Sequence, residues 1–330
     1  MTRVAQSIPL LMALCTAAPV AALAEPDHGY ARSGPYAVRT ISDPWRDASR
    51  ERILPVKFYA PQGEGPFPVI LFSHGLGGSR EGGSGWGSHW ASHGFLSVHL
   101  QHPGSDESLW RSSRISEMRA ALLSGMSVRQ FVDRNADVAF VIDEITRRVA
   151  AADPDLRGAD LSRIGMSGHS FGARTTLAVA GERFPVFGSN PEPRISAAVG
   201  FSPAATGPAG DFAARFGSIA MPFMSITGTD DDDVVANGST PDNRLVPFQN
   251  MRPPAKYLLV LRGGNHMVFN GVPGLARLDG AREAVIFNFS RAASTAFWKA
   301  HLLGDGIARA WLTREGLGRE LGADGEFLFK

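Results

Sequence analysis

Short apolar runs alternate with longer amphipathic stretches along this chain. Runs that are apolar at nearly every position are typical of strands covered on both faces of a sheet. The predicted strands are residues 53–59, 68–72, 95–100, 163–166, 197–201, 222–226 and 257–261. Helical spacing occurs near residues 85–93, 134–149, 170–182 and 282–302. Strands separated by helices predict an α/β fold with a mostly parallel central sheet and helices on both faces.

Residues 102–133 interrupt this alternation. The segment is longer than a simple connection from a strand to a helix, and it carries bulky side chains such as Trp110, Met118 and Leu122. One interpretation is a helix that covers the edge of the sheet. The other is a lid or pocket wall above a site at the carboxyl ends of the strands. The pattern leaves both open.

The N-terminus has the features of a cleavable signal peptide. Arg3 precedes an apolar run over residues 8–20, and Ala22-Leu23-Ala24 fits the small-x-small rule for cleavage. We expect a signal peptide over residues 1–24, cleavage after Ala24 and a single catalytic domain over residues 25–330, in a secreted or periplasmic protein. The alternative is a buried N-terminal helix. The run is too short to span a bilayer well, and no later run is suitable, so we expect no membrane span after cleavage.

Composition and charge narrow the classes of function. The chain has 330 residues, 44% of them hydrophobic, with 33 Lys and Arg against 32 Asp and Glu. High apolar content argues against disorder, and the absence of a basic excess argues against a nucleic-acid partner. The single cysteine, Cys15, lies in the predicted signal peptide. The mature chain therefore offers no thiol nucleophile and no disulfide.

The strongest chemical motif is Gly168-His169-Ser170-Phe171-Gly172. A predicted strand precedes it and a predicted helix follows, as in the nucleophile elbows that lift a serine above a sheet. The alternative is a glycine-rich turn with a bystander serine. A nucleophilic serine needs two backbone donors for an oxyanion. We expect the amide of Phe171 and that of Leu76, which lies in the glycine-rich turn after residues 68–72.

The elbow also calls for a base and an acid later in the chain. His266 and His301 are the two histidines after Ser170. We expect His266, which follows the strand at 257–261, because His301 falls late in a helix. The acid is expected in the run Asp230–Asp233, which follows the strand at 222–226. A Ca²⁺ site in that run is an alternative, although it lacks spaced ligands.

Four other histidines raise the question of a metal. His89 and His93 have helical i, i+4 spacing, and His99 and His102 are close in sequence. Without an H-E-x-x-H pattern, surface or core histidines are the better interpretation. We therefore expect neither a metal nor a cofactor.

Four motifs together resemble the α/β-hydrolase superfamily. They are Phe72-Ser73-His74-Gly75-Leu76-Gly77, Trp90-Ala91-Ser92-His93-Gly94-Phe95, Gly168-His169-Ser170-Phe171-Gly172 and Arg262-Gly263-Gly264-Asn265-His266. More narrowly, the chain resembles the platelet-activating factor acetylhydrolase and predicted dienelactone hydrolase-like group. In such families the acid lies three residues after the glycine equivalent to Gly228, which implies Asp231, with Asp232 as the alternative.

Two departures from these families affect what the resemblance implies. Animal acetylhydrolases carry the acid one strand earlier, where this chain has Phe201-Ser202. The acid must then follow the next strand, as in bacterial polyester hydrolases. Dienelactone hydrolases use a cysteine nucleophile, and the mature chain has none.

The resemblance implies a serine ester hydrolase that acts through a Ser-His-Asp triad and an acyl-enzyme. We expect catalytic Ser170, Asp231 and His266, an oxyanion hole at Leu76 and Phe171, and a short-chain ester or lipid as the small-molecule substrate. One alternative is a lipase- or polyester-hydrolase-like enzyme with an open cleft. Another is a non-catalytic binding protein on the same fold. The oligomeric state stays open.

Overall fold

Nine strands in the described part of the chain form one sheet, in the order β1-β2-β4-β3-β5-β6-β7-β8-β9. The computed structural model describes residues 29–330 except 112–113, 115, 185–187, 206–209, 233 and 235–237. The predicted signal peptide and Cys15 therefore lie outside the described residues. The strands are β1 (Val38–Asp47), β2 (Arg52–Pro61), β3 (Phe67–Ser73), β4 (Leu96–Leu100), β5 (Ala159–His169), β6 (Ile195–Phe201), β7 (Phe223–Asp230), β8 (Lys256–Asn265) and β9 (Gly325–Phe329).

The middle of the sheet is parallel and both edges are antiparallel. Strands β4, β3, β5, β6, β7 and β8 run parallel to their neighbours. At one edge β2 pairs antiparallel with both β4 and β1, and at the other edge β9 pairs antiparallel with β8. The predicted α/β-hydrolase fold is confirmed, and each predicted strand overlaps an observed one. The edge strands β1 and β9 were not predicted.

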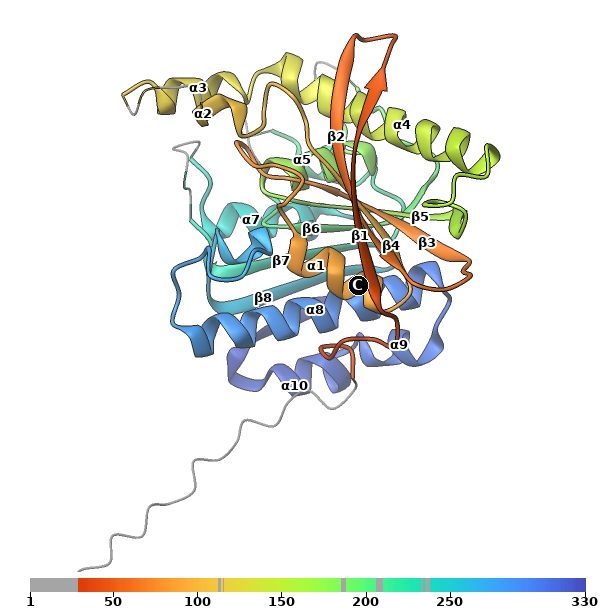
Figure 1. Cartoon of the computed structure of the whole chain (residues 1–330). Helices are drawn as coiled ribbons and strands as arrows, with labels where there is room; N and C mark the ends of the chain where they lie inside the picture. The colour runs from red at the N-terminus through yellow and green to blue at the C-terminus, as the bar shows by residue number, and fades with distance from the viewer. Residues whose placement is uncertain are drawn as a thin grey trace, which may run out of the picture.

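Helices cover both faces of the sheet (Figure 1). In Figure 1, α4 and α5 lie on one side of the sheet, and α8 and α9 lie on the other. The helices are α1 (Ser84–Ser92), α2 (Ser108–Arg111), α3 (Met118–Ser124), α4 (Val128–Ala150), α5 (Phe171–Val179), α6 (Phe212–Phe216), α7 (Pro241–Asn250), α8 (Gly280–Leu302), α9 (Gly306–Trp311) and α10 (Arg319–Leu321). None of these described helices is long and apolar enough to cross a membrane.

Alternation along β3 shows why its sequence is apolar at nearly every position. Val69 and Leu71 pack in one buried cluster with α4, whereas Ile70 and Phe72 pack in another with α1 and α8. Successive side chains of a strand point to opposite faces, so a strand covered on both faces needs apolar residues at both. The carboxyl end of β3 thereby has a fixed position in the middle of the sheet.

The segment over residues 102–133 lies against the turn that follows β3. Its described part consists of α2, α3 and the first turn of α4. The indole Nε1–H of Trp110 donates to the Gly77 carbonyl at 2.7 Å. A Cβ placed on Gly77 would come within 2.9 Å of Leu122. Because β3 is central in the sheet, these contacts place part of the segment at the carboxyl end of a central strand rather than only over a sheet edge.

Six of the described histidines are buried, and the four with the least exposure are His74, His99, His102 and His169. Burial lowers the pKa of each, because a charged imidazolium loses its hydration in the interior. The pKa of His99 falls to about 3 and that of His102 to about 4, and those of His74 and His169 lie well below the usual value. These rings are therefore neutral in the folded protein at neutral pH.

This burial predicts a protein that loses stability in mild acid. In the unfolded chain these histidines take up protons near pH 6.5, whereas in the folded chain His99 binds its proton only near pH 3 and His102 only near pH 4. The free energy of unfolding therefore falls as the pH drops below 6.5, by about 1.4 kcal/mol per pH unit for each of these two rings. His99 and His102 together predict a loss of about 3 kcal/mol between pH 7.5 and 5.5, and the lowered pKa values of His74 and His169 act in the same direction.

The measurement is the urea midpoint of unfolding across this pH range. A His99→Gln variant should show a shallower fall, because it removes one of the protons taken up on unfolding. Midpoints that barely change between pH 7.5 and 5.5 would contradict the prediction.

Candidate active site

Ser170 lies at a sharp turn between β5 and α5. Strand β5 ends at His169 and the helix begins at Phe171. The backbone of Ser170 has φ 56° and ψ −113°, and its N–H donates to the Phe201 carbonyl at 2.9 Å. A positive φ is strained for a residue with a Cβ, and such strain collects at functional sites. The turn brings the Ser170 hydroxyl to the carboxyl end of the central strands.

The two glycines of the motif allow this turn. A Cβ on Gly172 would collide with the carbonyl oxygen of Ser73 at the end of β3. A Cβ on Gly168 would lie 2.5 Å from the Gly172 carbonyl. The first turn of α5 therefore packs directly on the backbone of β3, with no space for side chains between them.

His266 lies next to Ser170 at the end of β8. Its Nε2 is 2.9 Å from the Ser170 Oγ, and its Nδ1 is 2.7 Å from Asp231 Oδ1. The ring of His169 packs on that of His266 with 4.7 Å between centroids, and its Nε2–H donates to the His266 carbonyl at 2.9 Å. Ring and backbone of His266 are thus both held. The hydroxyl, imidazole and carboxylate form one continuous hydrogen-bonded chain.

Asp231 is the member of the aspartate run that contacts His266. It is fully buried, whereas Asp230 and Asp232 are exposed and Asp233 lies outside the described residues. Thr227 Oγ1 donates to its Oδ2 at 2.7 Å. Burial would raise the pKa of Asp231, but the hydrogen bond from His266 and the charge of Arg244 outweigh burial and lower it. Asp231 is therefore ionised at neutral pH.

Arg244 of α7 is a buried cation beside this carboxylate. Its Nε lies 3.1 Å from Asp231 Oδ1 and donates to the Asp231 carbonyl at 3.1 Å. Its Nη1 donates to the Ser202 carbonyl at 3.0 Å, and its Nη2 lies 3.1 Å from His266 Nδ1. Arg244 thus ties the loop that carries Asp231 to the end of β6.

The turn after β3, which we call the 73–78 loop, lies against Ser170. A Cβ on Gly75 would be 3.5 Å from that of Ser170. In this loop the Gly77 amide donates to the Ser105 carbonyl and the Gly78 amide to the Gly75 carbonyl. In the described part of the chain, neither the Leu76 nor the Phe171 amide donates to another protein group. Two backbone donors therefore remain near the Ser170 hydroxyl.

The other histidines considered from the sequence bond elsewhere. The Nε2 of His301 lies 3.1 Å from the Tyr257 hydroxyl, away from Ser170. The rings of His89, His93 and His99 each bond to a backbone carbonyl. Among the described residues, no group of three or more His, Cys, Asp and Glu side chains could hold a metal ion.

Sequence reasoning missed the buried arginines Arg134 and Arg244. Arg134 did leave a signal, because it interrupts the buried stripe of α4 that Phe131 and Val138 continue at helical spacing. A charged residue in such a stripe needs a polar partner inside the protein. For Arg244 the sequence carries no comparable signal, since α7 was not predicted.

Comparison with known proteins supports the resemblance drawn from the motifs. Residues 53–149 match the model of a family described as platelet-activating factor acetylhydrolase, isoform II. The match runs from β2 through the 73–78 loop to α4 and ends before Ser170. No curated protein matches the chain significantly. The chain is therefore similar to an α/β-hydrolase-type family of acetylhydrolases, which supports a hydrolase of the esterase type.

Proposed function

We propose that the protein is a serine ester hydrolase in which Ser170, His266 and Asp231 act as the catalytic triad. The observation that carries the proposal is the chain of short hydrogen bonds from the Asp231 carboxylate through His266 to the Ser170 hydroxyl, at 2.7 and 2.9 Å. A strained serine at a strand–helix turn, with a base in hydrogen-bond contact, is the arrangement that nucleophilic catalysis requires.

In the first half of the reaction Ser170 Oγ attacks the ester carbonyl. His266 Nε2 takes the hydroxyl proton, and Asp231 stabilises the resulting imidazolium. The carbonyl oxygen becomes an oxyanion, which accepts hydrogen bonds from the amides of Leu76 and Phe171. His266 then gives its proton to the departing alkoxide, so the alcohol leaves and an acyl-Ser170 ester remains.

The second half repeats these steps with water. His266 takes a proton from water, and the hydroxide attacks the acyl carbonyl. When the second tetrahedral intermediate collapses, the proton returns to Ser170 Oγ and the carboxylic acid is released. The reaction steps proposed here use no metal or cofactor.

For the substrate we propose a short-chain ester or a lipid with a short acyl group. The indole of Trp110 is held on the Gly77 carbonyl, and Leu122 of α3 lies against the same glycine. We expect these bulky side chains, packed on the 73–78 loop, to limit the length of the acyl group that can bind beside Ser170. Secretion or periplasmic location with cleavage after Ala24 remains a proposal from the sequence.

Replacing the nucleophile tests the proposal most directly. We expect Ser170→Ala to lower kcat on nitrophenyl butyrate by at least about 10³-fold, because the reaction loses its covalent step. The thermal midpoint should change little, since alanine keeps the same Cβ at the strained turn. A fluorophosphonate should label the wild type and leave the variant unlabelled. Turnover of Ser170→Ala within tenfold of wild type would exclude the mechanism.

The acid can be identified with matched variants in one loop. We expect Asp231→Asn to lower kcat by about 10³–10⁴-fold, because the amide cannot hold and stabilise the protonated His266 ring. Asp230→Asn and Asp232→Asn change exposed neighbours and should stay within about threefold of wild type. The measurement is kcat of the three variants and of the wild type on the same ester. A large loss at Asp232→Asn instead would move the acid and leave the rest of the triad in place.

Acyl preference tests the pocket wall and separates the proposal from a lipase-like enzyme with an open cleft. We expect kcat/KM for nitrophenyl esters to be highest at acetate or butyrate and to decline through octanoate to palmitate. One methylene more or less changes the binding of the transition state by only about 1–3 kcal/mol, so the decline with chain length should be graded. Trp110→Ala should move the maximum to longer chains. A wild-type maximum at octanoate or beyond would favour the lipase-like alternative.

A further inference from the structure

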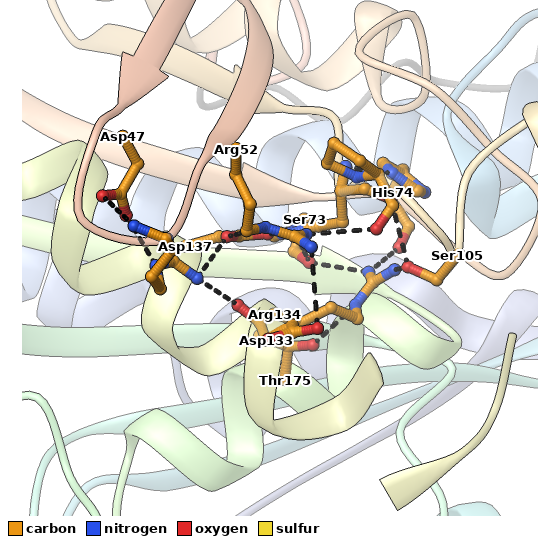
Figure 2. A network of polar contacts seen from close by, with 12 residues as sticks. Asp47, Arg52, Ser73, His74, Ser105, Asp133, Arg134, Asp137 and Thr175 are labelled. Carbon is orange, nitrogen blue, oxygen red and sulfur yellow. Dashed lines mark hydrogen bonds and ion pairs between the residues drawn. The ribbon is translucent and has the colours of Figure 1, made fainter. Parts of the chain in front are cut away.

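Arg134 of α4 is a buried cation whose hydrogen-bond acceptors are all neutral, while the carboxylates of Asp137 and Asp106 stabilise its charge without a hydrogen bond to it. The side chain is fully buried, and Figure 2 shows its guanidinium surrounded by Ser73, His74, Ser105 and Thr175. It donates to the hydroxyls of Ser105 and Ser73 at 2.9 Å, to that of Thr175 at 3.1 Å, and to the His74 carbonyl in a short hydrogen bond. Four hydrogen bonds to one guanidinium fix its position closely.

These contacts reach both halves of the proposed oxyanion hole. The His74 carbonyl belongs to the 73–78 loop and lies two residues before Leu76. On the other side, the Arg134 Cζ lies 4.5 Å from the centroid of the Phe171 ring. Thr175, which accepts from Arg134, donates to the Phe171 carbonyl at 3.2 Å. The Arg134 side chain therefore connects Phe171 to the loop that carries Leu76, and the amides of these two residues are the proposed donors to the oxyanion.

A second set of hydrogen bonds holds Ser73 and the arginine in place. Ser73 Oγ accepts from Arg134. The Asp137 carboxylate beside His102 Nδ1 accepts only, so in the neutral ring His102 Nε2 accepts from the Ser73 O–H at 2.9 Å. The other ring nitrogen of His102 then carries the proton and donates to Asp137 Oδ2 at 3.0 Å. Asp137 in turn pairs with Arg52 of the β1–β2 hairpin (Figure 2). It also pairs with Arg50 of the same hairpin.

The same proton count applies inside the 73–78 loop. A carbonyl oxygen accepts only, so His74 Nδ1–H donates to the Gly75 carbonyl at 2.6 Å. The other ring nitrogen of His74 accepts from the His102 backbone N–H at 3.0 Å. His74 is therefore neutral with a fixed tautomer, and its ring holds the backbone directly before Leu76.

Burying the charge of Arg134 costs free energy, because the side chain loses its hydration. Among the described residues, the acceptors of its hydrogen bonds include no carboxylate. Burial lowers the pKa of Arg134 to about 9, because neutral oxygens replace its hydration only in part. The cation is retained at neutral pH directly behind the loop where negative charge would develop in the reaction.

From these contacts we propose that Arg134 is a positioning residue, which holds the 73–78 loop and Phe171 in the relative placement that the oxyanion hole needs. The inference rests on the proposed function. Arg134 does not touch the substrate, and it acts through the His74 carbonyl on one side and through the Phe171 ring and Thr175 on the other.

The experiment compares Arg134→Met and Arg134→Lys with wild type in the full chain. For nitrophenyl butyrate we expect Arg134→Met to lower kcat by about 10²-fold, as for the loss of one oxyanion donor, with KM within about threefold. Arg134→Lys keeps the charge but loses the planar fork, and should still lose at least about tenfold. A trifluoromethyl ketone, which forms an oxyanion on serine, should bind more weakly by a similar factor. The matching methyl ketone should bind as to wild type.

Lys256 provides a matched control. It is also a fully buried cation, and it donates to the carbonyls of Ala220, Met221 and Pro254 at the amino end of β8, remote from Ser170. Lys256→Met should lower the urea midpoint while kcat and trifluoromethyl ketone affinity stay within about threefold of wild type. A purely structural role for Arg134 would give its variants the same result.

The outcomes separate this inference from the proposed function. Wild-type turnover that Ser170→Ala removes is the precondition, and its absence would reject the proposed function and the inference together. With that precondition met, Arg134 variants that keep kcat and ketone affinity within threefold would overturn the inference alone. Equal losses in Lys256→Met would also overturn it. If Arg134→Met does not fold, the test uses Arg134→Lys, whose kcat and trifluoromethyl ketone affinity are compared with those of the wild type.

Discussion

The candidate site depends on the direct contact between the first turn of α5 and the end of β3. A side chain at Gly172 would collide with the Ser73 carbonyl, and one at Gly168 would meet Gly172 itself. With no atoms between them, the helix and the strand hold Ser170 at a strained positive φ. The same contact places the 73–78 loop beside the amino end of α5. The positions of the Ser170 hydroxyl and of the Leu76 and Phe171 amides therefore all depend on this one contact between α5 and β3.

Buried charge is the second feature that shapes the site. Arg134 contacts the 73–78 loop and Phe171, Arg244 lies beside Asp231, and both side chains are buried. Removing a cation from water is expensive, and the loss is recovered only through well-placed acceptors. Arg134 finds hydroxyls and a carbonyl, whereas Arg244 finds Asp231 and the Ser202 carbonyl. Each arginine therefore ties together loops that come from distant parts of the chain.

The features predicted from the sequence depend mostly on residues that are close together in the chain. The features that were missed depend mostly on contacts between residues far apart in it. The buried parallel strands and the strand–serine–helix turn are local patterns, and apolar runs or glycines within a few residues reveal them. The residues alone left the run Asp230–Asp233 open, and the family resemblance implied Asp231, which is the aspartate that contacts His266. Strands β1 and β9 were missed because an edge strand with an exposed face lacks a continuous apolar run. The roles of Arg134 and Arg244 were missed because their partners lie 13 to 61 residues away and because α7, which carries Arg244, was not predicted.

Proton placement shows how Arg244 and Asp231 act on the same ring. His266 Nδ1 lies 2.7 Å from Asp231 Oδ1 and 3.1 Å from Arg244 Nη2. A carboxylate accepts and a guanidinium donates, so Nδ1 can bond well to one of them at a time. With the proton on Nδ1 the ring bonds to Asp231, and Nε2 is left to accept the proton of Ser170. The opposite tautomer would bond to Arg244 and put a proton on Nε2, where the base is needed. The shorter distance and the ionised state of Asp231 favour the first tautomer, so the buried carboxylate sets the ring in the state that the proposed attack by Ser170 would require.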